Sequence, residues 1–248
     1  MRKPLIAGNF KMYKTISETH IYAKGLRAAL ASVADREVAV CPPFTALAAV
    51  AEELRGSPIA WGSQNVHWEK QGAFTGEISA EMLKELGCRF AIAGHSERRQ
   101  YFGETDQTVN KRMHAVLVAG ITPIVCIGET LQEREANTTF SVVERQMKNG
   151  LQGLVSNATI VIAYEPVWAI GTGKTATPAQ AQEVHAFIRS QLAKTFGDTF
   201  AKLTRVLYGG SVKPDNMSAL MSQPDIDGGL VGGACLDVES FSKIVRYQ

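Results

Sequence analysis

The chain has 248 residues, of which 45% are hydrophobic and 20% are charged, as in ordinary soluble globular proteins. Its formal net charge of +2 comes without a basic run, which argues against nucleic-acid binding as the main function and is compatible with a small anionic substrate. There is no charged-then-apolar leader and no apolar run of 18 residues, so we expect a cytoplasmic protein that neither enters nor crosses a membrane.

The cysteines and histidines are spaced unlike the ligands of a metal site. Cys41, Cys88, Cys126 and Cys235 form no C-x-x-C pair, so we interpret them as core thiols in a reducing compartment. None of the five histidines belongs to an H-x-x-x-H pair with a nearby acid. No metal site is predicted.

Short apolar segments, each followed by a polar loop and an amphipathic helical segment, recur along the chain. Eight such units in 248 residues give about 31 residues each, the size of one βα module. The alternation predicts a parallel sheet, and eight equal units without a linker favour one closed (β/α)8 barrel domain over residues 1–248. The predicted strands are Leu5–Gly8, Val38–Cys41, Ile59–Gly62, Phe90–Ala93, Pro123–Ile127, Ile160–Ala163, Arg205–Tyr208 and Gly229–Val231.

In such a barrel, the loops that follow the strands build the site. After the first strand, Asn9 and Lys11 are two residues apart, so on an extended chain they point to the same side, where they could hold a carbonyl and an anion. Taken alone, this lysine could equally be a solvated surface residue. The segment Gln64–Ser79 is an unusually long loop, and its Phe74–Gly76 tip is hard to explain as an ordinary turn.

His95 directly follows the fourth predicted strand, and Ser96 and Glu97 resemble the first turn of a helix. The positive end of a helix dipole favours a neutral imidazole, which can donate a proton to a developing enolate oxygen and take it back. The alternative is a structural histidine bonded to the backbone. Glu97 could instead form an ion pair with Lys11, and both readings stay open.

Glu165 stands at the exit of the sixth strand, followed by Pro166, which has no N–H to give to a neighbouring strand. The segment Pro166–Lys174 is apolar and then glycine-rich, so it resembles a lid with hinge-like ends. A base on a rigid strand end beside such a lid suits proton abstraction in a site without water. The lid residues are Pro166, Val167, Trp168, Ala169, Ile170, Gly171, Thr172, Gly173 and Lys174.

Glycine pairs follow the seventh and eighth strands, at Gly209–Gly210 and Gly232–Gly233. They let backbone N–H groups approach an anion, and these two exits often bind phosphate in barrels.

Farther from the site, Thr177–Gln180 predicts a helix start, with a stripe of buried residues behind it. Pro214 and Asp237 mark the starts of the last two helices. The predicted stripe is Ala181, Val184, His185, Ile188 and Leu192.

Seven of these segments closely resemble motifs of the triosephosphate isomerase family, and the resemblance runs from Leu5 to the last helix. The segments are Gly8–Met12, Gly72–Ser79, Gly94–Arg99, Cys126–Thr130, Ala163–Lys174, Tyr208–Val212 and Leu230–Ala234.

The resemblance implies a TIM barrel that interconverts dihydroxyacetone phosphate and D-glyceraldehyde 3-phosphate, without a cofactor or metal. Glu165 would remove the carbon-bound proton, and His95 would polarise the carbonyl and move protons between the two oxygens. Lys11 and Asn9 would stabilise the enediolate and hold the substrate. This family is itself the standard example of a glutamate base paired with a neutral histidine.

The resemblance also implies phosphate binding by backbone N–H groups and a homodimer. Phe74 and Thr75 would insert beside the partner's catalytic residues, and Ser96 and Glu97 would support the site. The phosphate-binding residues would be Gly171, Ser211, Gly232 and Gly233.

Three positions depart from the commonest family pattern, although none removes a chemical group from the site. Phe10 stands where Trp is frequent, Tyr13 where Asn is common, and Cys235 where Ser is frequent. Tyr13 and Lys14 lie near the implied interface, so they bear on the strength of the dimer rather than on the chemistry.

Two other functions compete with the isomerase. One is another sugar-phosphate barrel enzyme, such as an aldolase, but a Schiff-base aldolase needs a lysine on an inner strand, and no predicted strand has one. The other is a non-catalytic phosphate-binding barrel, since fold does not fix function. Loss of Glu165 or His95 would have indicated the latter, and both are present.

Overall fold

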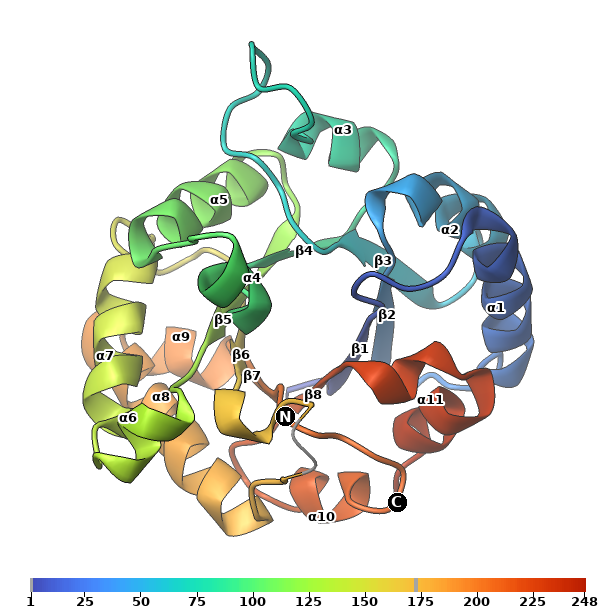
Figure 1. Cartoon of the computed structure of the whole chain (residues 1–248). Coiled ribbons are helices and arrows are strands. Elements are labelled where there is room, and N and C mark those ends of the chain that lie inside the picture. The colour runs from blue at the N-terminus through green and yellow to red at the C-terminus, as the bar shows by residue number, and fades with distance from the viewer. Residues whose placement is uncertain (1, 172–173) are drawn as a thin grey trace.

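The computed structural model describes residues 2–171 and 174–248, which form a ring of strands enclosed by helices (Figure 1). The eight strands pair in chain order as a closed barrel, and each pair is parallel, with β8 next to β1. The predicted barrel is confirmed, whereas its assignment as one domain over residues 1–248 stays a prediction. The strands are β1 Leu5–Asn9, β2 Glu37–Cys41, β3 Ile59–Ser63, β4 Phe90–Ala93, β5 Thr122–Ile127, β6 Val161–Tyr164, β7 Arg205–Tyr208 and β8 Gly228–Val231.

The helices lie outside the ring and cover the strands. They are α1 Ile16–Ala29, α2 Leu47–Leu54, α3 Ala80–Glu85, α4 Ser96–Tyr101, α5 Asp106–Val118, α6 Leu131–Glu135, α7 Thr139–Gly150, α8 Pro178–Phe196, α9 Asp198–Leu203, α10 Met217–Met221 and α11 Val238–Val245. Three short 3-10 turns complete the elements of the described residues: η1 Phe44–Ala46, η2 Val167–Ala169 and η3 Gly233–Leu236. Among the described residues, no helix is both long and apolar enough to cross a membrane.

Local capping explains where the last helices begin. Thr177 and Gln180 form the expected capping box before α8, and the predicted stripe behind them is buried. Asp237 caps α11, as expected. The helix expected at Pro214 begins only at Met217, because the Asn216 side chain accepts a 2.8 Å bond from Lys213 N and closes a turn first.

Two layers of apolar side chains hold the barrel together. An inner layer fills the ring with alternate strand residues such as Leu5, Ile92 and Leu207, and an outer layer lies between strands and helices. Each fully buried Leu or Ile contributes about 1.5–3 kcal/mol by leaving water. The interior is therefore packed, and functional groups can gather only at its ends.

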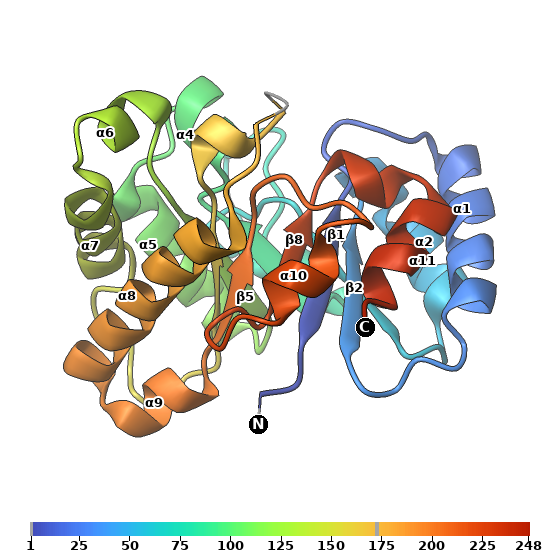
Figure 2. The same ribbon diagram turned by 90° about the horizontal axis from the view of Figure 1, so that it is seen from below.

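The carboxyl ends of the strands point to the end of the barrel that carries α4, α6 and η2, whereas α9 and the N-terminus lie at the opposite end (Figure 2). The loop 64–79 projects beyond the ring, beside α3 and α5 (Figure 1). Its two legs are joined by a 2.7 Å bond from His67 N to Ile78 O.

Candidate active site

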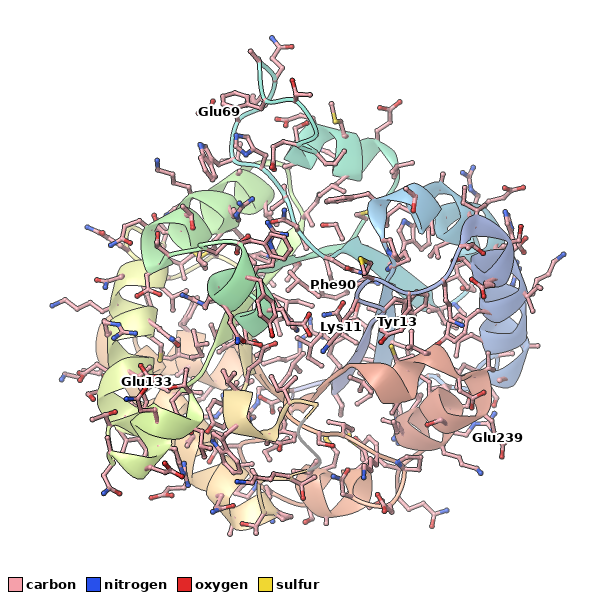
Figure 3. All side chains as sticks on the ribbon, in the orientation of Figure 1. Lys11, Tyr13, Glu69, Phe90, Glu133 and Glu239 are labelled. Carbon is pink, nitrogen blue, oxygen red and sulfur yellow. The ribbon has the colours of Figure 1, made fainter. Side chains whose placement is uncertain are left out.

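A cavity of about 360 Å³ opens at the carboxyl ends of the strands. Figure 3 shows Lys11 within the ring of strands, with Tyr13 close by. The cavity brings together seven predicted site residues: Asn9, Lys11, His95, Gly171, Ser211, Gly232 and Gly233. It is also lined by Ile170 of the predicted lid and by the predicted glycine pair Gly209–Gly210. The other lining residues had no role at the site in the sequence analysis: Tyr13, Val212, Lys213, Leu230 and Ala234.

The segment after β1 turns sharply at Lys11, which has a φ of 52°. The expectation of an extended chain there is wrong, because the Asn9 side chain accepts a 3.0 Å bond from Lys11 N and closes a tight turn. Both side chains still line the cavity. Lys11 Nζ lies 2.6 Å from Glu97 Oε1, so the ion pair that the sequence left open is formed.

His95 caps the N-terminus of α4 with its own ring. Nδ1 accepts a 3.2 Å bond from Glu97 N, so this nitrogen carries no proton. With Nδ1 as the acceptor, Nε2 is the ring nitrogen that can donate a proton. His95 is only 6% exposed, so Nε2 acts in a largely desolvated site.

Glu165 follows β6, and its carboxylate is almost completely buried, with 2% of the residue exposed. Oε2 accepts a 2.8 Å bond from Ser96 N, and Oε1 lies 3.1 Å from His95 Nε2. Glu165 does not line the cavity that holds the other site residues. It lines a neighbouring cavity of about 300 Å³ together with Ser96 and Val167. The bond to Ser96 N therefore holds the carboxylate at the edge of the site.

The glycines at the ends of β7 and β8 give space to their neighbours. A Cβ at Gly209 would lie 2.9 Å from Glu165 Cγ, and one at Gly210 would lie 2.3 Å from the Tyr208 hydroxyl. A Cβ at Gly232 would lie 3.4 Å from Lys11 Cε. Larger residues would therefore displace the base and narrow the cavity in which backbone N–H groups can meet an anion.

Comparison with known proteins agrees with this geometry. The family model for triosephosphate isomerase matches residues 4–248. The chain belongs to the triosephosphate isomerase family. Triosephosphate isomerases of Endomicrobium trichonymphae and Moorella thermoacetica are 59% and 57% identical to it, over all of both chains. The crystal structure of the Bartonella henselae triosephosphate isomerase superposes with a TM-score of 0.89 at 41% identity, over 98% of this chain and 97% of that one.

In this triosephosphate isomerase family member, the segment after Glu165 begins with the 3-10 turn η2 rather than with a helix. Val167 N donates to Glu129 O at 3.0 Å, and Trp168 Nε1 donates to Glu129 Oε1 at 3.0 Å. Gly171 has a φ of 68°, which favours glycine. Two predicted lid residues, Thr172 and Gly173, lie outside the described residues.

Glu129 is a further polar residue beside this site to which sequence reasoning gave no role. Its carboxylate is fully buried, accepts a bond from Tyr164 Oη at 3.0 Å, and lies 3.5 Å from Arg134 Nη1. Burial, with the Glu129 charge as the next cause, raises the pKa of Tyr164. Glu129 stands at the exit of β5 within the motif Cys126–Thr130, so its position at a strand end was the available signal.

Phe74 and Thr75 line neither of the two cavities. Both are exposed, and the Phe74 ring lies 4.6 Å from the His67 ring. Among residues 2–171 and 174–248, no group of three or more His, Cys, Asp or Glu side chains could hold a metal ion.

Proposed function

We propose that this chain interconverts dihydroxyacetone phosphate and D-glyceraldehyde 3-phosphate through an enediolate, with Glu165 as the base. Family membership supports the reaction. The observation that carries the mechanism is the pairing of Glu165 with His95 at 3.1 Å, beside a cavity lined by Lys11 and by the glycines that follow β7 and β8. No cofactor is needed, because the carbonyl of the substrate acidifies the neighbouring C–H bond.

The base starts from a position in which it cannot act on substrate in the larger cavity. Its bond to Ser96 N must break before the carboxylate turns toward the reacting carbon. Because the group is buried, the proton transfer proceeds with little water around it, where electrostatic effects are strong. Ser96 therefore supports the base in its resting position.

His95 would donate from Nε2 to the carbonyl oxygen as charge develops there. Its Nδ1 is occupied by Glu97 N, which holds the tautomer with the proton on Nε2. Lys11 places a positive charge at the same cavity, and its ion pair with Glu97 fixes the ammonium group. Asn9 lines the cavity beside it and shapes the Lys11 turn.

Four residues line one cavity, and their N–H groups would hold the phosphate: Gly171, Ser211, Gly232 and Gly233. Gly171 belongs to the lid segment 166–174. With the N–H of Gly171 on the phosphate, the C–O bond stays out of line with the π system of the enediolate, so phosphate is not expelled. Trp168 and Ile170 would exclude water.

The rival barrel functions have less support. None of the described strands carries a lysine, which a Schiff-base aldolase would need inside the barrel. A non-catalytic phosphate-binding barrel would not need a buried carboxylate beside a neutral imidazole.

The test is a coupled assay of the purified protein with D-glyceraldehyde 3-phosphate in buffer without added metal, in the presence and absence of a chelator. We expect rapid formation of dihydroxyacetone phosphate in both. Phosphate binding without turnover would support the non-catalytic barrel, and turnover that requires metal would contradict the proposed mechanism.

We also propose a cytoplasmic homodimer. The buried free cysteines support a reducing compartment. For the dimer, the support is a set of large apolar side chains that are exposed on the segments after β1, β3 and β4. They are Met12, Tyr13, Ile16, Phe74, Met82, Tyr101 and Phe102.

Shortening the tip of the loop 64–79 tests the dimer. We expect a folded monomer with poor activity, because the partner's Lys11 and His95 lose their support. Analytical ultracentrifugation with the coupled assay measures both. A shortened variant that still sediments as a dimer, or a fully active monomer, would contradict the proposal.

A further inference from the structure

The tyrosine at position 22 lies on α1 and does not line the cavity, yet it contacts two of the segments that build it. We propose that Tyr22 is a positioning residue that fixes the segment carrying Lys11 relative to the phosphate-binding turn after β8. This inference rests on the proposed function and assigns a new residue to it.

The hydroxyl of Tyr22 is bonded to the phosphate-binding turn. It donates to the Cys235 carbonyl at 2.6 Å, and Tyr22 is only 4% exposed. Cys235 belongs to η3, and its own N–H donates to Gly232 O at 2.8 Å. Burial raises the pKa of Tyr22 well above its usual range, so the hydroxyl keeps its proton and remains a donor. The turn is thereby tied to α1.

The ring of Tyr22 is packed against the segment that carries Lys11. The Phe10 ring meets it edge-on with centroids 5.0 Å apart, and Phe10 stands between Asn9 and Lys11 in the chain. On the far side of the same segment, Lys14 Nζ lies 4.9 Å from the ring centroid. One side chain therefore contacts this segment both before and after Lys11.

The same segment has a backbone that needs support. Lys11 and Lys14 have φ values of 52° and 72°, a region that residues other than glycine rarely adopt. Such conformations persist when surrounding contacts hold them in place. The Asn9 side chain supports the turn at Lys11, and the Tyr22 ring lies under Lys14.

The two segments joined by Tyr22 also fit closely together. A Cβ at Gly8 would lie 3.0 Å from Cys235 Cβ, and one at Gly232 would lie 3.4 Å from Lys11 Cε. With so little free space, a small shift of η3 changes the distance between the Lys11 ammonium and the Gly232 N–H. Both groups are proposed to act on one substrate, so this distance matters for binding.

An ordinary core role for Tyr22 predicts a different result from a positioning role. A core residue affects the free energy of unfolding and leaves substrate affinity unchanged in the folded protein. A positioning residue changes the affinity of the site for phosphate even where the protein is fully folded. Tyr22→Phe separates the two roles, because it keeps the ring and removes only the hydroxyl.

We expect Tyr22→Phe to raise KM for D-glyceraldehyde 3-phosphate and the dissociation constant of inorganic phosphate together, by about 3–10-fold, as for the loss of one buried hydrogen bond. We expect kcat to stay within about twofold, since this bond is made equally before and during the reaction. Tyr247→Phe is the control, because it removes a tyrosine hydroxyl near the C-terminus, where the ring packs against the Arg36 guanidinium at 4.0 Å.

The measurements are steady-state kinetics, calorimetric titration with inorganic phosphate, and thermal unfolding of the same samples. Unchanged KM and phosphate affinity in Tyr22→Phe, with or without lower stability, would overturn the proposal. Phosphate titration does not require turnover, so the role of Tyr22 can be decided even if the protein proves not to be an isomerase. Tyr22→Leu, which also removes the ring contacts, should weaken phosphate binding further if it folds.

Discussion

Two buried carboxylates, one at each end of the barrel, are held in different ways. At the amino-terminal end, Asp227 lies 2.5 Å from Arg2 Nε and 2.7 Å from Arg189 Nη2, and it accepts a 2.8 Å bond from Val206 N. At the carboxyl end, Glu165 has one backbone N–H bond and an imidazole nitrogen 3.1 Å away. Asp227 is fixed by two cations, whereas Glu165 is left able to move and to accept a proton.

A second carboxylate follows the same rule at the amino-terminal end. Glu37 lies 2.5 Å from both Arg89 Nη2 and Arg205 Nη1, and the two guanidinium groups lie 5.8 and 5.9 Å from the Phe90 ring centroid. Figure 3 shows Phe90 within the ring of strands. These ion pairs therefore cover the apolar interior at the amino-terminal end of the barrel. In barrels of this class, that end serves stability and the other serves function.

The largest effect is expected from Glu165→Gln at the carboxyl end. Loss of a general base lowers kcat by about 10²–10⁴-fold. The free energy of unfolding should stay equal or rise, because glutamine keeps an acceptor for Ser96 N and removes a buried charge. Coupled assays and urea unfolding of the same preparation measure both quantities. Near-normal turnover in this variant would rule out Glu165 as the base.

The opposite pattern is expected from Asp227→Asn at the amino-terminal end. Removing one partner of a buried ion pair costs about 3–5 kcal/mol, and we expect about 3 because Arg2 and Arg189 are partly exposed. At low temperature, kcat and KM should match the parent. The control is Asp35→Asn, whose exposed pair with Arg36 should contribute less than about 1 kcal/mol. If Asp227→Asn lost activity while fully folded, the two ends would not divide their roles as described.

Sequence reasoning located the barrel and the exits of its strands, but apart from the Lys11–Glu97 pair, which it left open, it did not give the contacts made across the barrel. Each strand bound lies within one residue of its prediction, because short apolar runs and their flanking polar residues are local signals. The bond between Ser96 N and Glu165 joins residues 69 apart, and the one between Arg205 and Glu37 joins residues 168 apart. No local pattern encodes such pairs. Neither the cavity that Glu165 lines nor the ion pairs of Glu37 at the amino-terminal end could therefore be predicted. The roles proposed for the site residues stay predictions until the variants are measured.

The smallest effect concerns pH and a histidine near the Asp227 network. His185 is fully buried on α8, and its Nδ1 lies 3.2 Å from Asp225 O. The ring centroids of His185 and Tyr164 are 5.8 Å apart. Burial lowers the pKa of His185 from 6.5 to about 4, against smaller opposing effects of the Asp225 carbonyl and the Asp227 charge. The unfolded chain therefore takes up a proton at a higher pH than the folded protein. Stability is complete above pH 6.5 and is lost as pH falls toward 4.

Comparison with His185→Gln isolates this contribution, because the variant has no proton to gain at this position. Relative to the variant, the parent should lose about 1 kcal/mol of unfolding free energy between pH 7.5 and 5.5. Urea unfolding of both proteins at the two pH values measures the difference, with His114→Gln as the control, since its ring bonds to Gln152 O near the surface. A difference that stays constant with pH would mean that His185 titrates alike in both states. If the pH dependence of the unfolding free energy changes in His185→Gln but not in His114→Gln, this acid sensitivity lies at the amino-terminal network, away from Glu165 and His95.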